Sequence, residues 1–170
     1  MKEFLYCIIY FMATGILGFI LGRLLPKSWF LYDGFPYRCA KFERGGALYD
    51  KMNIHKWQTK LPDMSRLVPW AMPAKNLKTC NSSKLLTMIQ ETCIAEFIHW
   101  MLCITGLGSF FIWQNPFCVL LYLIYVLVFN IPFIIIQRYN RPRLLHLRYI
   151  LLQREKKKNT KETQDATSYS

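Results

Sequence analysis

The chain has 170 residues, of which 53% are apolar and 16% aromatic, and it carries a formal net charge of +12. The apolar residues fall into long blocks, which is typical of a membrane protein and argues against one larger soluble core. Basic residues flank these blocks, so we expect an anionic lipid surface or a phosphorylated substrate as their partner, not nucleic acid. The six cysteines show no Cys-x-x-Cys pair, which indicates neither a disulfide framework nor a zinc site.

The apolar blocks predict an all-α integral membrane protein with about three transmembrane helices. The first span covers about 4–25, and the residues before it lack the positive excess of a signal peptide, so we expect a retained helix. A polar segment follows at 26–91. The second span covers about 92–113, and a Gln-Asn-Pro turn joins it to a third span at about 117–137 as an antiparallel hairpin.

The polar parts of the chain contain further expected elements. An amphipathic helix around 49–60 is expected to lie in the membrane interface. A basic helix follows the third span, so that residues 1–158 form a single domain, and residues 159–170 form a disordered polar tail. In the first span, Gly18 and Gly22 permit the close approach of another helix.

The distribution of positive charge predicts the orientation of the spans. Nearly all Lys and Arg residues lie in the 26–91 segment or after the third span, and the hairpin turn has none. By the positive-inside rule, we expect a multi-pass cell-membrane protein whose polar segment and C-terminus are cytoplasmic and whose N-terminus is outside.

Two ionisable residues, Glu96 and His99, lie within the second span. An ionisable side chain at the centre of a bilayer costs at least about 2.5–3.5 kcal/mol, so such residues are functional-site candidates. Their spacing of three puts them on one helical face, and the predicted orientation puts them one to two turns inside the cytoplasmic membrane surface. A structural interhelical hydrogen bond is the alternative interpretation.

The hairpin brings the end of the third span to the same membrane surface, which predicts a polar pocket. Its further lining is expected to come from Asn130, Gln137, Arg138, Asn140, Arg141 and Arg143. Arginine forks suit phosphate groups, although arginines after a span are also ordinary topology anchors.

These residue types together favour acyl transfer to a hydroxyl. His99 is the expected general base, because imidazole gains and loses a proton near neutral pH, and Glu96 is expected to accept its hydrogen bond and fix its tautomer. No Gly-x-Ser-x-Gly elbow is present, which favours direct transfer over a covalent intermediate. A metal site with His55, Asp63 or His146 as third ligand is an alternative that no spacing demands, so we expect no metal.

Three segments carry a more specific pattern: HKWQTKLPD at 55–63, ETCIAEFIHW at 91–100 and NIPFIIIQRYNRPRL at 130–144. In this order and spacing they resemble the glycosyl-4,4'-diaponeurosporenoate acyltransferase family, whose namesake is the last enzyme of staphyloxanthin biosynthesis. The resemblance extends from about residue 20 to 155, and the run QRYNRPRL is its most specific part.

The resemblance implies a small membrane acyltransferase that acts on a hydroxyl of a lipid-linked or glycosylated acceptor, as the namesake does on a glycosylated carotenoid. We take His99 and Glu96 as candidate catalytic residues. The candidate substrate-binding residues are Asn130, Gln137, Arg138, Asn140, Arg141, Arg143, Trp57, Lys60 and Asp63. No bound cofactor is expected. The expected partners are the lipid bilayer, the acceptor and an acyl donor, either acyl-CoA or acyl carrier protein.

Two other classes of protein stay open at this point. A non-enzymatic membrane subunit would use the glycine face and the hairpin to pack against a partner. Another small membrane enzyme, such as a lipid methyltransferase or reductase, would bind a nucleotide-bearing cofactor through the same arginines, but the chain has no glycine-rich cofactor loop. The acyl chain, the acceptor and the oligomeric state also stay open, and a homo-oligomer is compatible with the sequence.

Overall fold

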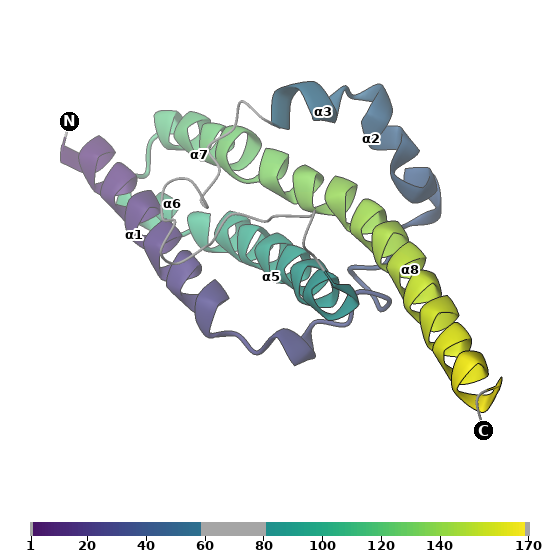
Figure 1. The fold of residues 1–170 in the computed structure, drawn as a ribbon. Helices are drawn as coiled ribbons and strands as arrows, with labels where there is room; N and C mark the ends of the chain where they lie inside the picture. Colours follow the sequence, from purple (N-terminus) through teal and green to yellow (C-terminus); the bar gives the residue numbers. More distant parts are fainter. Residues whose placement is uncertain (1, 59–80, 169–170) are drawn as a thin grey trace.

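The computed structural model describes residues 2–58 and 81–168, except for the side chains of 161–163 and 165–168. These residues form helices joined by turns (Figure 1). Three helical stretches in them are long and apolar enough to cross a membrane, namely Lys2–Leu24, Ser82–Ile112 and Pro116–Thr160. The predicted all-α membrane fold with three spans is therefore confirmed.

Helix α1 (Lys2–Leu24) packs against helix α5 (Ser82–Gly106) through its glycines. A Cβ atom placed on Gly18 would lie 3.2 Å from side-chain atoms of both Ile98 and Leu102, and one on Gly22 would lie 3.3 Å from Ile98. The two backbones therefore approach closely because glycine has no side chain at these two positions. Most other apolar side chains of α1 are exposed and would face lipid.

Helix α5 begins well before the predicted second span. Asn81 caps it, since its side-chain oxygen accepts the Lys84 N–H at 2.9 Å. The short helix α6 (Ser109–Ile112) and the turn before helix α7 (Pro116–Phe129) complete the predicted hairpin. The helical part of the chain that follows this turn, which we call the return limb, lies alongside α5 (Figure 1).

The return limb consists of α7 and helix α8 (Ile131–Ser168), which meet at Asn130. Helix α8 continues through Pro142 and beyond the predicted end of the third span at 137. It packs there beside the first turns of α5, where the Ser82 hydroxyl donates to Glu155 at 2.9 Å. It also runs through most of the predicted disordered tail, because residues 159–168 include good helix formers that extend an existing helix.

The described part of the polar segment directly after α1, residues 26–58, folds into short elements: η1 (Lys27–Trp29), η2 (Lys41–Gly46), α2 (Ala47–Lys51) and α3 (Ile54–Trp57). The predicted amphipathic helix at 49–60 is thus divided, because Asn53 takes the left-handed conformation with φ 52°. Tyr49 and Ile54 pack on Tyr139 of α8, whereas Met52 and His55 are exposed.

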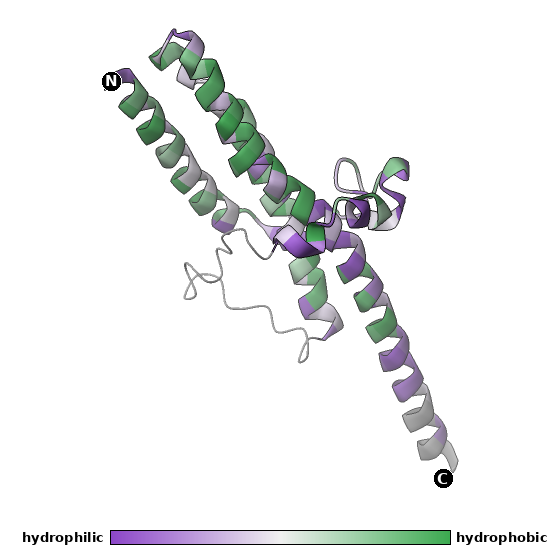
Figure 2. Cartoon of the chain, turned by 90° about the horizontal axis from the view of Figure 1, so that it is seen from above, coloured by the Kyte–Doolittle hydropathy of each residue, from purple (hydrophilic) through white to green (hydrophobic). Residues whose placement is uncertain are grey.

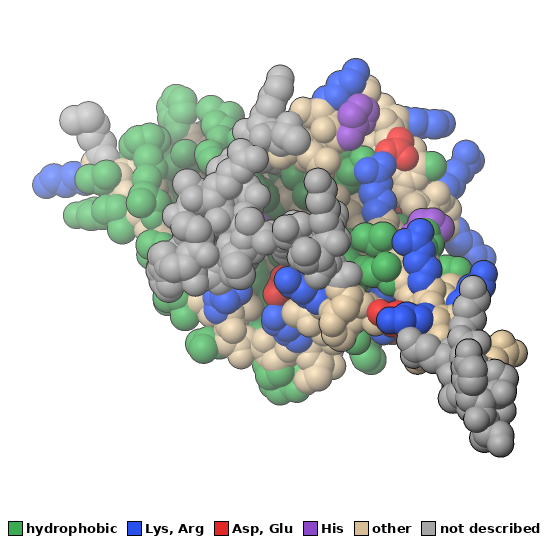
Figure 3. All heavy atoms as spheres, viewed as in Figure 1, with side chains coloured by type: hydrophobic (Ala, Val, Ile, Leu, Met, Phe, Trp, Pro, Cys, Tyr) green, Lys and Arg blue, Asp and Glu red, His purple; other side chains and the backbone are tan. Residues whose placement is uncertain are grey.

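Hydropathy separates the molecule into two ends. The apolar end contains α1, α7 and the parts of α5 and α8 beside them, whereas the short helices of residues 27–57 and the distal half of α8 are more hydrophilic and lie toward the other end (Figure 2). Lys and Arg side chains gather toward that second end (Figure 3). Helix α1 stops where the polar segment begins, so the boundary between the two ends passes across the middle of α5.

Candidate functional site

One face of α5 carries the polar residues of the site. Thr92, Glu96, His99 and Cys103 follow one another at intervals of four, three and four residues, which aligns them on one side of a helix. Thr92 and Glu96 meet α8, His99 meets Asn130, and the Cys103 carbonyl accepts the hydroxyl of Tyr122 in α7 at 3.0 Å. This face therefore presents a column of polar groups to the return limb.

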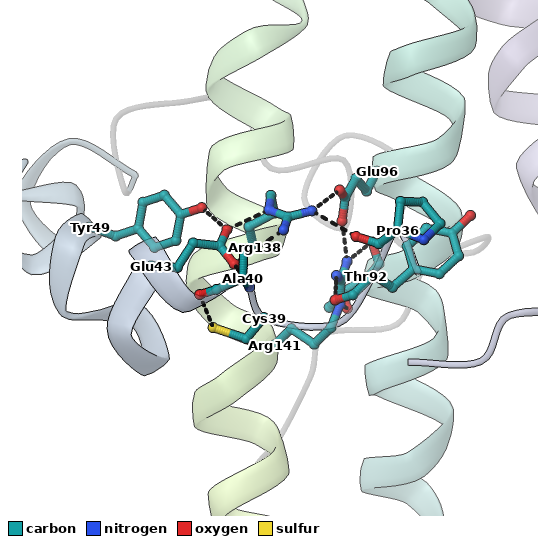
Figure 4. A network of polar contacts seen from close by, with 10 residues as sticks. Pro36, Cys39, Ala40, Glu43, Tyr49, Thr92, Glu96, Arg138 and Arg141 are labelled. Atoms are coloured by element: carbon teal, nitrogen blue, oxygen red, sulfur yellow. Dashed lines mark hydrogen bonds and ion pairs between the residues drawn. The ribbon is translucent and has the colours of Figure 1, made fainter. Parts of the chain in front are cut away.

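Glu96 joins two arginines in a buried ion-pair network (Figure 4). Its side chain is 1% exposed, and each carboxylate oxygen accepts from a different arginine of α8. Arg138 Nη1 donates to Oε1 at 2.6 Å, and Arg141 Nη2 donates to Oε2 at 2.5 Å. The arginines are three residues apart on α8, so both reach the same carboxylate.

A second buried carboxylate, Glu43 of η2, holds the other edge of Arg138. Arg138 donates from Nε to Oε1 at 2.6 Å and from Nη2 to Oε2 at 3.1 Å, which is a bidentate pair. The Ala40 N–H donates to Oε2 at 2.5 Å, and the Tyr49 hydroxyl donates to Oε1. Gly45 and Gly46, with φ of 66° and 105°, turn the chain directly after this carboxylate.

This environment shifts the pKa values of Glu43 and Tyr49, which both lie outside the spans. Burial by itself raises the pKa of Glu43, but the hydrogen bonds from Arg138, Tyr49 and Ala40 outweigh it and lower this pKa to about 2. Burial, followed by the hydrogen bond to the Glu43 carboxylate, raises the pKa of the Tyr49 phenol. Glu43 is therefore ionised and Tyr49 neutral at neutral pH.

Arg141 is 3% exposed and ties α8 to both α5 and the polar segment. It donates from Nε to the Thr92 hydroxyl at 2.9 Å and from Nη2 to the Thr92 carbonyl at 3.2 Å. Its Nη1 donates to the Tyr37 carbonyl at 2.7 Å, and Arg138 makes a comparable bond to the Pro36 carbonyl at 3.1 Å. The arginines thus fasten the polar segment onto the helices.

The network is balanced in charge and almost saturated in hydrogen bonds. Two guanidinium groups face two carboxylates, and each guanidinium uses all but one of its N–H groups in the bonds described above. A cavity of about 20 Å³ beside Arg138 and Arg141 has room for one water molecule. A phosphate group would have to displace existing partners of these arginines.

His99 belongs to a different cluster, one turn further into the span. Its Nδ1 lies 3.1 Å from Asn130 Oδ1, and its ring stacks on Phe133 with centroids 5.0 Å apart and planes at 9°. Asn130 is 1% exposed and donates from Nδ2 to the Tyr125 carbonyl at 2.9 Å. His99 is half-buried.

The predicted hydrogen bond between His99 and Glu96 is therefore wrong. The two residues do share a face of α5, but successive turns of α5 meet different turns of the return limb. Glu96 meets Arg138 and Arg141, whereas His99 meets the junction of α7 and α8. A charged guanidinium is also a stronger partner for a buried carboxylate than a neutral imidazole is.

Both clusters lie close to the end of α1. Gly22, two residues before α1 ends, faces Ile94 and Ile98 of α5. Lys27 Nζ in η1, just beyond that end, pairs with Glu91 at 2.8 Å. His99 therefore lies about one turn inside the level at which the polar segment starts.

Arg143 and Trp57, two of the remaining predicted residues, make their contacts outside these two clusters. Arg143 is exposed, donates to Asp50 at 2.7 Å and covers the ring of Tyr139 at 3.9 Å. The Trp57 indole N–H donates to the Met52 carbonyl at 3.2 Å on the far side of α8. Gln137 and Asn140 are half-buried on α8, while Lys60 and Asp63 lie outside the described residues.

Several members of the network were missed at the sequence level. Thr92 had a usable signal, because it lies four residues before Glu96 on the same helical face. Glu43 had only a weak one: two arginines beside a single carboxylate leave a positive charge that a second acid can balance. The carbonyls of Pro36 and Tyr37 had none, because every residue has a carbonyl.

Metal ligands do not gather in the described part of the chain. Among the side chains that the structure describes, no three His, Cys, Asp or Glu lie together as a metal site would require. His55 and His146, two of the alternative third ligands, are exposed.

Comparisons with known proteins match most of the chain. A protein-family profile described as glycosyl-4,4'-diaponeurosporenoate acyltransferase matches residues 26–149, which contain both clusters. Two proteins of that name, from Staphylococcus aureus strains bovine RF122 / ET3-1 and USA300, are each 32% identical over 155 residues, covering 90% of this chain and 92% of the relative. One from strain N315 is 31% identical over 159 residues, with the same coverage. No solved structure matches.

Proposed function

Because this chain belongs to the glycosyl-4,4'-diaponeurosporenoate acyltransferase family, we propose that it transfers a fatty acyl group to a sugar hydroxyl of a glycosylated, carotenoid-like membrane lipid. The protein is a membrane acyltransferase with three spans. Its acceptor is therefore an amphiphile, with a sugar at the membrane surface and a hydrocarbon part in the bilayer.

The observation that carries the mechanism is the position of His99. It lies in a span, half-buried, about one turn inside the level at which α1 ends. A sugar headgroup at the surface reaches this depth, while its hydrocarbon part lies along the exposed apolar faces of the spans. The apolar surroundings keep bulk water scarce, which favours transfer of the acyl group over its hydrolysis.

In this mechanism His99 is the general base. It takes the proton of the sugar hydroxyl while the oxygen attacks the thioester carbonyl carbon of the donor. The carbon–sulfur bond then breaks, and the leaving thiolate takes the proton back from the imidazolium. The products are an ester and a free thiol, and His99 returns to its neutral form.

Glu96, Arg138 and Arg141 have a different role from the one expected from the sequence. Their mutual ion pairs and the bonds to Glu43 hold the polar segment against α5 and α8. We assign them to forming the wall of the site, because phosphate binding would break these pairs.

The donor is a thioester of coenzyme A or of acyl carrier protein, and the site is at the cytoplasmic surface of the cell membrane. The clustering of Lys and Arg at the polar end supports this orientation, with the N-terminus outside (Figure 3). A cytoplasmic site would face the compartment that contains both thioesters.

Acyl transfer by the purified protein in lipid vesicles tests the proposal. The acceptor is a glycosyl diaponeurosporenoate, and separate reactions contain acyl-CoA or acyl carrier protein. His99→Gln is expected to reduce kcat by about 10²- to 10⁴-fold. His146→Gln, at an exposed position of α8, is the matched control and should leave kcat unchanged. Acyl transfer that survives His99→Gln would overturn the mechanism, and no transfer by the wild type with either donor would overturn the function.

The orientation is tested separately with a membrane-impermeant maleimide. Cys39 is exposed in the polar segment, whereas Cys7, Cys93, Cys103 and Cys118 are buried. In a Cys80→Ser background, Cys39 should react only after the cells are permeabilised. Labelling of intact cells would place this segment outside.

A further inference from the structure

Asn130 is held in place at the junction of α7 and α8, next to His99. It is 1% exposed, its N–H donates to the Val126 carbonyl at 3.2 Å, and its own carbonyl accepts the Ile134 N–H at 3.1 Å. These bonds fix the backbone of Asn130, and burial restricts its side chain. The amide can therefore act as a fixed partner for a neighbouring group.

The hydrogen bonds of this amide define its orientation. The Tyr125 carbonyl can only accept a hydrogen bond, so the group 2.9 Å from it must be the Asn130 NH₂. The amide oxygen then faces His99 Nδ1 at 3.1 Å. Since that oxygen also only accepts, Nδ1 must carry the proton, and a neutral imidazole has its free electron pair on Nε2.

We propose that Asn130 is the positioning residue that holds His99 as its Nδ1–H tautomer, so that Nε2 is the atom that takes the proton from the acceptor hydroxyl. This inference rests on the proposed function. Asn130 thus takes the part that the sequence assigned to Glu96, whose two carboxylate oxygens both face arginines.

Phe133 completes the positioning of the ring. It lies three residues after Asn130, on the first turn of α8, and stacks on His99 with the two planes 9° apart. The stack sets the plane of the imidazole, and the amide sets its rotation within that plane. One short stretch of chain, 130–133, therefore controls both the tautomer and the direction of Nε2.

The tautomer can be observed directly by NMR of protein labelled with [¹⁵N]histidine in detergent micelles. The chain has three histidines, so His55→Gln and His146→Gln variants isolate the signal of His99. In the wild type, the proton of neutral His99 is expected on Nδ1. In Asn130→Leu it is expected to move partly or wholly to Nε2. A wild type with its proton on Nε2, or an unchanged tautomer in Asn130→Leu, would overturn the inference.

Kinetics supply the second readout. Asn130→Leu should lower kcat by about 10- to 100-fold with KM changed less than about threefold, because the acceptor is still bound but the base is misdirected. Asn130→Asp keeps an acceptor for Nδ1–H, so it should recover activity and move the acid limb of the pH–rate profile to higher pH. Val128→Ala, an exposed position of α7 close to the junction, is the control and should behave as wild type.

The possible failures are distinguishable. If His99→Gln abolishes transfer while Asn130→Leu retains wild-type kcat, the proposed function stands and the role of Asn130 is wrong. If Asn130→Asp is no more active than Asn130→Leu, the amide serves only the structure of the junction. If His99→Gln is fully active, the base mechanism fails and this inference fails with it.

Discussion

Two polar clusters lie one helical turn apart on the same face of α5, and they differ in charge and in completeness. The Glu96–Arg138–Arg141–Glu43 network is fully charged, and nearly every donor in it has a partner. The His99–Asn130 pair contains no carboxylate or guanidinium and has one directed hydrogen bond to the ring, in a half-buried position. In the proposed mechanism the first cluster is a structural clamp, and the second provides the nitrogen that takes the proton.

This difference shows why ionisable residues within a span need not share one role. Charged groups buried next to hydrocarbon require complete pairing, and complete pairing leaves no capacity for a substrate. A neutral imidazole costs less to bury and needs only one partner. Substitutions in the first cluster should therefore act mainly on stability, and substitutions in the second mainly on turnover.

The largest stability effect is expected from Arg141→Met. Removing this buried guanidinium leaves Glu96 with one arginine partner and removes the hydrogen bond from Arg141 to the Tyr37 carbonyl. The free energy of unfolding should fall by about 3–5 kcal/mol. Arg143→Met, two residues along α8, is the matched control, because its pair with Asp50 is exposed and is worth only about 0–1 kcal/mol. Chemical denaturation in micelles measures the free energy of unfolding of both variants. Equal losses in the two would contradict a structural role for the first cluster.

Tyr49→Phe is expected to have the next largest effect. It removes the hydroxyl that donates to the buried Glu43 carboxylate, and hydrogen bonds to charged groups contribute about 1.5–3 kcal/mol. Tyr149→Phe changes the same chemical group at a position that is 61% exposed, so its free energy of unfolding should equal that of the wild type. If the two variants had the same denaturation midpoint, the hydrogen bond from Tyr49 to Glu43 would contribute nothing to stability.

Gly18→Leu tests the contact between α1 and α5, which contains neither cluster. The new side chain would meet Ile98 and Leu102, where even a Cβ lies at 3.2 Å, so we expect a loss of about 1–3 kcal/mol. Gly15→Leu has no atom within 4 Å of the new Cβ and is the control. Activity per folded molecule should be unchanged in both, and a specific loss in Gly18→Leu would show that α1 contributes to the site.

Stability is also expected to depend on pH through two residues at the edge of the first cluster, Glu43 and Tyr49. Folding lowers the pKa of Glu43 to about 2 from its ordinary value of 4.5, so its stabilisation is complete above about pH 4.5 and is lost as the pH falls toward 2. Folding raises the pKa of Tyr49, so that contribution is present below the ordinary value of 10.0 and declines as the pH rises above it. Thermal unfolding across pH measures both limbs.

Variants identify the two limbs. Glu43→Gln should remove the acid decline between about pH 4.5 and 2, and Tyr49→Phe should remove the alkaline decline. If stability declines as steeply at acid pH in Glu43→Gln as in the wild type, the decline arises from other carboxyl groups.

Much of the fold was predictable, because the signals for spans are local. Hydrophobic blocks, a short Gln-Asn-Pro turn and flanking basic residues were enough to predict three helices and a hairpin. The ends of the helices were less predictable: α5 begins at Ser82 and α8 continues past Pro142, since packing of these two polar segments on each other extends both. The division of the 49–60 helix at Asn53 depends on one backbone angle that the sequence does not reveal.

The sequence by itself determined which residues share a face of α5, because helical spacing is a local property. It placed Glu96 and His99 together and placed Asn130, Arg138 and Arg141 on the limb that returns beside them. Only the tertiary structure decided the pairing. The relative position of α5 and the return limb brings Glu96 to the arginines and His99 to Asn130, and the folded polar segment adds Glu43. Hydrogen-bond partners are set to within a few tenths of an ångström by packing between helices, which spacing along one helix cannot define.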